Sequence, residues 1–136
     1  MKRIAKRIPF GLLRLLVVAG ANGCVLAAAG AGAGAGIYVT DRGAESLVAA
    51  PVARTFEASR AAFQELGITE TRTITDSEGG AEKRTLQGKT ADREIEVELK
   101  SEGASTRVGV VAKKTAVTWD KDLARKLLGE IVERSK

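Results

Sequence analysis

The strongest constraint on the fold is an alternation of apolar and polar residues in two neighbouring segments, residues 93–100 and 106–113. The first segment interleaves Ile95, Val97 and Leu99 with Glu94, Glu96 and Glu98, and the second repeats the period with Val108, Val110 and Ala112. Successive side chains of a β-strand point to opposite faces of the sheet. The two segments are therefore predicted to be strands that each bury one face.

The residues between these segments, Ser101-Glu102-Gly103-Ala104, predict a tight hairpin. We expect Val97 to lie opposite Val108, Ile95 opposite Val110, and Glu98 opposite Arg107. This register pairs apolar with apolar residues and acid with base, and a slip of one residue would destroy both matches.

Further extended segments precede this hairpin. Residues 68–75 and 83–89 are predicted strands, separated by a loop over residues 77–80. Residues 37–40 and 45–49 are expected to form short extended segments, divided by Arg42 and Gly43.

Two amphipathic helices complete the predicted elements. The first begins with Pro51 as its first helical residue, ends at Gly67 as its C-cap, and carries an apolar stripe: Val52, Phe56, Ser59, Phe63 and Leu66. The second is capped by Thr118 or Asp120, and its stripe is Leu123, Leu127, Leu128 and Ile131. Trp119 is expected to pack at the start of this helix rather than to serve as a ligand platform.

Two helices with apolar stripes and a sheet with one apolar face bury each other. We therefore predict an α+β fold over residues 37–136, in which a four-stranded or five-stranded antiparallel sheet has both helices on one face and its other face polar.

The composition excludes much familiar chemistry. The chain has no histidine and one cysteine, so it has no imidazole base, no cysteine pair for zinc and no intrachain disulfide. Its serines lack a histidine base, and Glu94, Glu96 and Glu98 are expected on a solvated strand face. We predict that the protein is not an enzyme and has no catalytic, cofactor-binding or metal-binding residue.

The net charge of +5 comes from the N-terminal segment. Residues 1–23 contain five basic residues and no acid, which leaves 17 Lys and Arg against 17 Asp and Glu in the rest of the chain. A neutral domain with few aromatic residues argues against nucleic-acid binding.

The first 23 residues have the order of a secretory signal, with a cationic start, an apolar stretch and then small residues. They end in Ala21-Asn22-Gly23-Cys24, where the sequence resembles a bacterial lipoprotein signal. The resemblance implies that Cys24 receives a diacylglyceryl group and that cleavage occurs just before it. Cys24 is thus the predicted lipidation site, with residues 1–23 as signal peptide and residues 24–36, rich in glycine and alanine, as a tether.

An uncleaved membrane helix is the alternative anchor, since residues 15–39 carry no charge and are long enough to span about 30 Å of hydrocarbon. Either anchor would place the domain beyond the inner membrane. Val25 follows Cys24, and in Gram-negative lipoproteins the absence of aspartate at this position implies sorting to the outer membrane, with the inner membrane as the alternative.

The whole order of elements resembles a domain-of-unknown-function family of small bacterial envelope lipoproteins, which has no assigned activity. We therefore expect a membrane-tethered binding or structural module. Its polar sheet face or its edge strand, residues 68–75, would contact another envelope component such as a protein partner. The alternative is a periplasmic carrier that binds a small ligand or lipid between its helices and its sheet.

Overall fold

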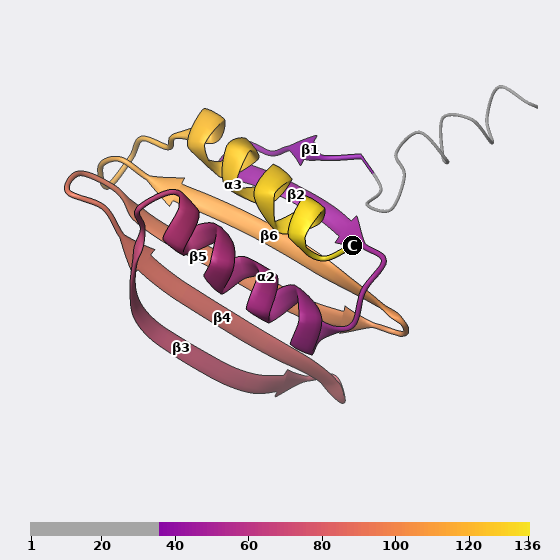
Figure 1. Ribbon diagram of the computed structural model, residues 1–136. Helices are drawn as coiled ribbons and strands as arrows, with labels where there is room; N and C mark the ends of the chain where they lie inside the picture. The colour runs from indigo at the N-terminus through magenta and orange to yellow at the C-terminus, as the bar shows by residue number, and fades with distance from the viewer. Residues whose placement is uncertain (1–35) are drawn as a thin grey trace, which may run out of the picture. The chain divides into compact units, whose positions relative to one another are not determined.

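The computed structural model describes residues 36–136, which form an open sheet with two helices side by side on one face (Figure 1). The elements follow in the order β1 (Tyr38–Val39), β2 (Gly43–Val48), α2 (Val52–Glu65), β3 (Thr69–Glu78), β4 (Ala81–Lys89), β5 (Glu94–Glu102), β6 (Ser105–Lys113) and α3 (Lys121–Arg134). All neighbouring strands are antiparallel, in the order β1-β2-β6-β5-β4-β3. The predicted signal peptide, Cys24 and most of the tether lie outside the described residues.

The predicted α+β class and the two helices are confirmed, but the predicted number of strands is wrong. The sheet has six strands rather than four or five. The segments expected to be merely extended join it: β2 pairs with β6 over six residue pairs, and β1 pairs with β2. The buried residues of β2 include the small side chains Ala44 and Ser46, so its sequence lacks a strong apolar alternation. The predicted edge strand is correct, because β3 ends the sheet.

The predicted register of the β5–β6 hairpin is wrong by two residues. Val97 lies opposite Val110 rather than Val108, and Glu98 lies opposite Gly109 rather than Arg107. The cause is the turn, which is centred on Gly103 and Ala104, one residue further along than predicted. Gly103 has a φ of +65°, which suits the first central position of a type II′ turn. A shift of two residues keeps every side chain on its predicted face.

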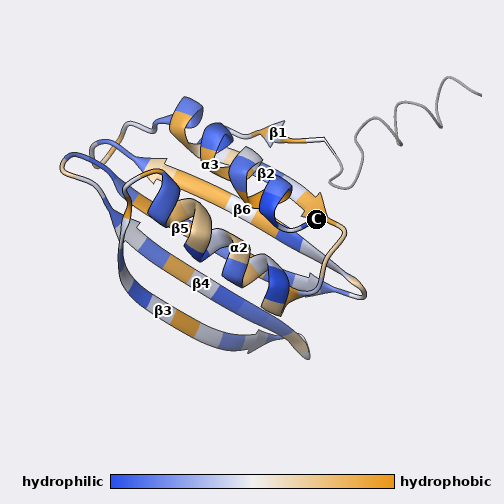
Figure 2. Ribbon diagram, in the orientation of Figure 1, coloured by the Kyte–Doolittle hydropathy of each residue, from blue (hydrophilic) through white to orange (hydrophobic). Residues whose placement is uncertain are grey.

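The buried core lies between the helices and the sheet. The predicted stripe of α2 faces inward, with Val52, Phe56 and Phe63 buried, and so does that of α3, with Leu127, Leu128 and Ile131 fully buried. The sheet contributes its predicted apolar residues to the same cluster: Leu86, Ile95, Val97, Leu99, Val108, Val110 and Ala112. Figure 2 shows hydrophobic colour along β6 beneath the helices and mostly hydrophilic colour on β3.

The helix ends differ slightly from the prediction. Pro51 is the N-cap of α2 rather than its first helical residue. Of the two predicted caps of α3, the structure selects Asp120, whose side chain accepts a hydrogen bond from the Leu123 N–H. Within residues 36–136, neither helix combines the length and the apolar character needed to cross a bilayer.

Candidate functional site

The face of the sheet opposite the helices is polar, as predicted. Glu94, Glu96 and Glu98 of β5 point to it, since the intervening Ile95 and Val97 are buried under the helices. Cross-strand neighbours on the same face come from β4 and β6. We call this surface the open face.

One end of the open face, near the β3–β4 and β5–β6 turns, carries a network of ion pairs. Lys83 lies 3.1 Å from Glu78 and 3.2 Å from Glu98. Arg107 contacts Glu45 at 2.7 Å and Glu102 at 2.6 Å. Every one of these charges therefore has an opposite charge beside it.

The pKa values follow from these contacts. The Lys83 ammonium, through its hydrogen bond, is the main cause that lowers the pKa of Glu78, and Arg107 likewise lowers the pKa of Glu102. Hydrogen bonds to the carboxylates raise the pKa of Lys83 and of Arg107. The charged forms of these side chains thus favour each other, and this end of the open face is electrostatically satisfied.

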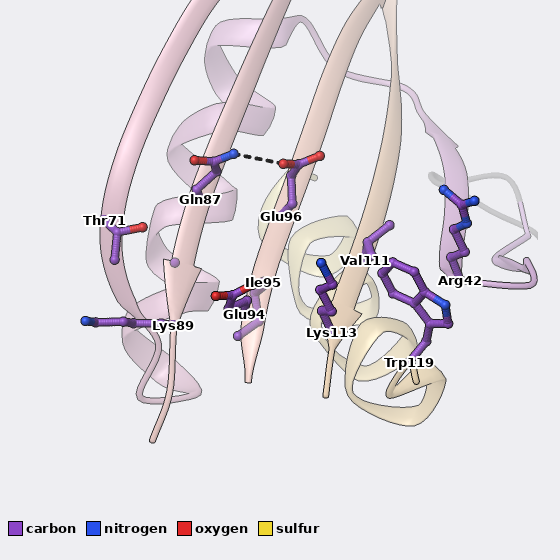
Figure 3. Close-up of a pocket in the computed structure, with 11 residues that line it drawn as sticks. Arg42, Thr71, Gln87, Lys89, Glu94, Ile95, Glu96, Val111, Lys113 and Trp119 are labelled. Atoms are coloured by element: carbon purple, nitrogen blue, oxygen red, sulfur yellow. Dashed lines mark hydrogen bonds between the residues drawn. The ribbon is translucent and has the colours of Figure 1, made fainter. Parts of the chain in front are cut away.

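The other end of the open face is hollowed. A hollow of about 460 Å³ lies over the ends of β4, β5 and β6 (Figure 3). The residues that line it are Arg42, Thr71, Gln87, Gly88, Lys89, Glu94, Ile95, Glu96, Val111, Lys113 and Trp119. A second hollow of about 500 Å³ adjoins it, and Lys89, Glu94 and Lys113 line both.

Trp119 forms one side of the first hollow. The Arg42 guanidinium carbon lies 5.5 Å from the centre of its ring, and the Lys113 Nζ lies 5.9 Å from it. In Figure 3 the ring lies between these two side chains. As expected, Trp119 lies at the start of α3, directly before the Asp120 N-cap, where it is partly buried and outside the buried cluster. An isolated bridge between Lys113 and Trp119 holds it beside β6.

A row of charges without ion-pair partners crosses the sheet here. Glu94 lies opposite Lys89 on one side and opposite Lys113 on the other. In the described part of the chain, none of these three side chains forms an ion pair, and neither does Arg42. Glu96 in the next row accepts a hydrogen bond of 2.9 Å from the Gln87 amide. We call Lys89, Glu94 and Lys113 the charge row.

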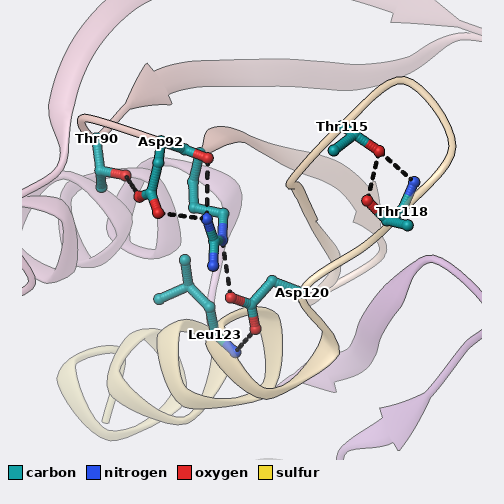
Figure 4. A network of polar contacts seen from close by, with 7 residues as sticks. Thr90, Asp92, Thr115, Thr118, Asp120 and Leu123 are labelled. Carbon is teal, nitrogen blue, oxygen red and sulfur yellow. Dashed lines mark hydrogen bonds and ion pairs between the residues drawn. The ribbon is translucent and has the colours of Figure 1, made fainter.

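Arg93, between β4 and β5, is by contrast engaged in structure. Its Nε lies 2.9 Å from Asp120 Oδ2, and one terminal nitrogen donates to Asp92 at 2.6 Å. Figure 4 shows Asp120 bonded on its other side to the Leu123 N–H. This network joins the β4–β5 loop to the first turn of α3.

The buried hydroxyl groups also serve the fold. Thr55, Ser59, Thr106 and Ser135 each donate to a backbone carbonyl oxygen. Among residues 36–136, no group of three His, Cys, Asp or Glu side chains is placed to share a metal ion.

The comparison with protein families identifies the chain. A family model described as "Protein of unknown function (DUF3568)" matches residues 8–134. The chain belongs to the DUF3568 family. No curated protein matches the sequence. The DUF3568 match spans both the described domain and the segment that contains Cys24, and it confirms the predicted membership of a domain-of-unknown-function family.

Only part of this site was predicted from the sequence. Glu94 and Glu96 were expected on the polar face that contacts a partner, but Trp119 was given no binding role, and the contributions of Arg42, Lys89 and Lys113 were missed. The signal that joins these residues is the strand register, which places Lys89, Glu94 and Lys113 in one line.

Proposed function

We propose that this DUF3568 protein is a lipid-anchored, non-catalytic binding module of the bacterial cell envelope, and that its open face engages another envelope component. The observation that carries the binding role is the contrast between the two ends of that face. At one end the charges pair with each other, and at the hollowed end the charge row has no ion-pair partners among the described residues. Charges left unpaired beside a hollow are suited to an external ligand.

The sequence supports a lipid anchor at Cys24. A cationic start, an apolar stretch and Gly23 precede this single cysteine. Each buried methylene contributes about 0.8 kcal/mol to membrane binding, and one acyl chain alone gives only marginal attachment. The several chains of a bacterial lipoprotein would therefore hold the protein stably, with residues 24–36 as a tether. Val25 after the cysteine favours the periplasmic face of the outer membrane, with the inner membrane as the alternative.

An uncleaved membrane helix over residues 15–39 is the alternative anchor. Residues 38 and 39 of that stretch form β1, so a span would have to end before them. The carrier alternative has less support. A ligand between helices and sheet would compete with Phe63, Leu86, Leu127 and Leu128, which are at most 2% exposed and fill that layer.

The anchor is tested by palmitate labelling of the full chain and of Cys24→Ala, followed by membrane fractionation and intact-mass analysis. We expect label and membrane association in the wild type and no label in the variant. Equal labelling of both proteins would contradict lipidation at Cys24. An unlabelled protein that keeps its N-terminal methionine and stays in the membrane would instead support the uncleaved helix.

The binding face is tested by photocrosslinking in intact cells. A photoreactive amino acid replaces Val111, which lines the hollow, and in a matched control it replaces Lys126, which is exposed on α3. We expect position 111 to give one reproducible adduct that the control lacks. Identical adducts from both positions, or none from position 111, would contradict a binding role for the open face.

A further inference from the structure

We propose that the hollow beside Trp119 binds a zwitterionic peptide segment, in which two carboxylates flank one ammonium group. The inference rests on the binding role proposed above for the open face and specifies its ligand class. It follows from the order of charges across the strands and from the polar groups between them.

The charge row has the order cation, anion, cation. Lys89, Glu94 and Lys113 come from three neighbouring strands and lie in register. Neighbouring strands lie about 4.8 Å apart, so the two lysines arise from positions about 10 Å apart with Glu94 midway between them. A ligand that matches this row carries an amine between two carboxylates with a similar spacing.

The Lys113 end of the row is the stronger anion site. Arg42 and Lys113 both contact the Trp119 ring, which lies between them, so two cations are at this end of the row and only one is at the Lys89 end. Each retains hydrogen-bond donors, and a guanidinium can bind a carboxylate through two parallel bonds. One ligand carboxylate is therefore expected here and the other at Lys89.

The mixed lining excludes ligands of a single charge. A polyanion such as a nucleic acid or a phosphate polymer would meet Glu94 and Glu96, and a purely cationic ligand would meet Arg42, Lys89 and Lys113. A ligand that carries both signs satisfies the lining without leaving a repelled charge.

Polar groups in the hollow suit a peptide backbone. Thr71 lies at a β-bulge between Glu70 and Arg72, and it joins the lining of the hollow. Its hydroxyl makes no hydrogen bond to the described residues. Gln87 donates to Glu96 and keeps its carbonyl oxygen as an acceptor. A donor and an acceptor are thus available for the amide groups of a ligand.

Trp119 is the single tryptophan of the chain, so its fluorescence reports directly on the hollow. The full chain in a mild nonionic detergent is titrated at low salt with acetyl-Glu-Gly-Lys-Gly-Glu-amide, whose three charged side chains lie on one side of an extended backbone. We call it the Glu-Lys-Glu peptide after its charged residues. Two matched peptides follow, one with both Glu replaced by Gln and one with Lys replaced by norleucine. We expect a Kd of about 0.1–1 mM for the first peptide, about tenfold weaker binding without the carboxylates, and about threefold weaker binding without the amine.

Variants test the assignment of each charge. Glu94→Gln is expected to abolish the preference for lysine over norleucine, and Lys89→Met to weaken the Glu-Lys-Glu peptide about threefold. Lys126→Met on the exposed side of α3 is the control and should change neither value. Circular dichroism melting verifies that each variant is folded, and a variant that is not folded is replaced by Glu94→Ala or Lys89→Gln, which also remove the charge.

The proposal is overturned if the Glu-Lys-Glu and Gln-Lys-Gln peptides bind equally, if Glu94→Gln keeps the lysine preference, or if no peptide binds at about 10 mM. A specific crosslink from position 111 together with any of these results would leave the binding role of the open face intact and remove only this ligand class. If the peptide binds but position 111 gives no such crosslink in cells, the result would contradict the proposal that the open face engages a partner in the envelope.

Discussion

The carboxylate of Asp120 connects the start of α3 to Arg93. One of its oxygens accepts a hydrogen bond of 3.0 Å from the Leu123 N–H, and the other lies 2.9 Å from the Arg93 Nε. The first contact satisfies a helix N–H that has no partner within the helix, and the second ties the β4–β5 loop to the same turn. A single side chain thus positions α3 against the end of the sheet that carries the hollow.

Two substitutions of Asp120 are expected to separate these roles. Asp120→Ala removes the cap and the ion pair, whereas Asp120→Asn keeps an efficient cap and removes only the charge. We predict that the alanine variant loses about 1 kcal/mol more free energy of unfolding than the asparagine variant, measured by urea denaturation of the full chain. Equal stability of the two variants would show that the Leu123 hydrogen bond contributes nothing.

The same carboxylate predicts a pH dependence. The Leu123 N–H, followed by the Arg93 guanidinium, lowers the pKa of Asp120 below its ordinary value of 3.8. A folded-state pKa below the unfolded value stabilises the protein above the unfolded pKa, and this contribution disappears as the pH falls through the folded pKa.

We therefore expect the wild type to melt at a higher temperature than Asp120→Asn at about pH 6, and the difference to shrink as the pH falls below about 4. The comparison with Asp120→Asn isolates the effect of Asp120. Glu78 and Glu102 also have lowered pKa values, but their protonation in acid destabilises the wild type and the variant equally. A difference in melting temperature that stays constant down to about pH 2 would contradict the assignment to Asp120.

Most of the fold could be predicted because the apolar patterns that indicate it arise within single strands and helices. Ile95, Val97 and Leu99 must share a face in any strand that contains them, and the structure buries all three. By contrast, β2 buries Ala44 and Ser46, whose small side chains give little pattern, and its place beside β6 is set by tertiary packing. The strand count was therefore the part of the fold that local patterns could not supply.

The candidate site could not be predicted from the sequence because the turn between β5 and β6 shifts the register. With the predicted hairpin, Glu94 would lie opposite Val111, but the turn centred on Gly103 and Ala104 places it opposite Lys113. A shift of two residues keeps each side chain on its predicted face but changes the residue that lies opposite it in the β5–β6 pair. Charge order across a sheet thus depends on turn geometry, which the pattern of apolar residues alone does not determine.

Two glycines, Gly88 on β4 and Gly109 on β6, are expected to respond differently to alanine. A Cβ on Gly88 would lie 2.5 Å from the Phe63 ring and 2.9 Å from the Thr69 carbonyl oxygen, whereas a Cβ on Gly109 would have nothing within 4 Å. We predict that Gly88→Ala costs about 1–3 kcal/mol of unfolding free energy through overpacking. Gly109→Ala should be neutral or slightly stabilising, because alanine reduces the freedom of the unfolded chain.

Urea denaturation of both glycine variants in parallel measures this difference in unfolding free energy. A loss confined to Gly88→Ala is expected, since α2 packs directly on that position. If Gly88→Ala were as stable as Gly109→Ala, the close packing of Phe63 against β4 would be disproved.

The two faces of the sheet are expected to respond differently to an introduced aspartate. Val97 is completely buried under the helices, whereas Val111 is only partly buried on the open face. Val97→Asp would bury a carboxylate without a partner, which costs several kcal/mol or forces its protonation. We expect it to abolish cooperative unfolding, while Val111→Asp keeps a cooperative transition because its carboxylate reaches water. Thermal melts followed by circular dichroism measure both, and a Val97→Asp protein that melts like the wild type would mean that the faces of β5 have been assigned the wrong way round.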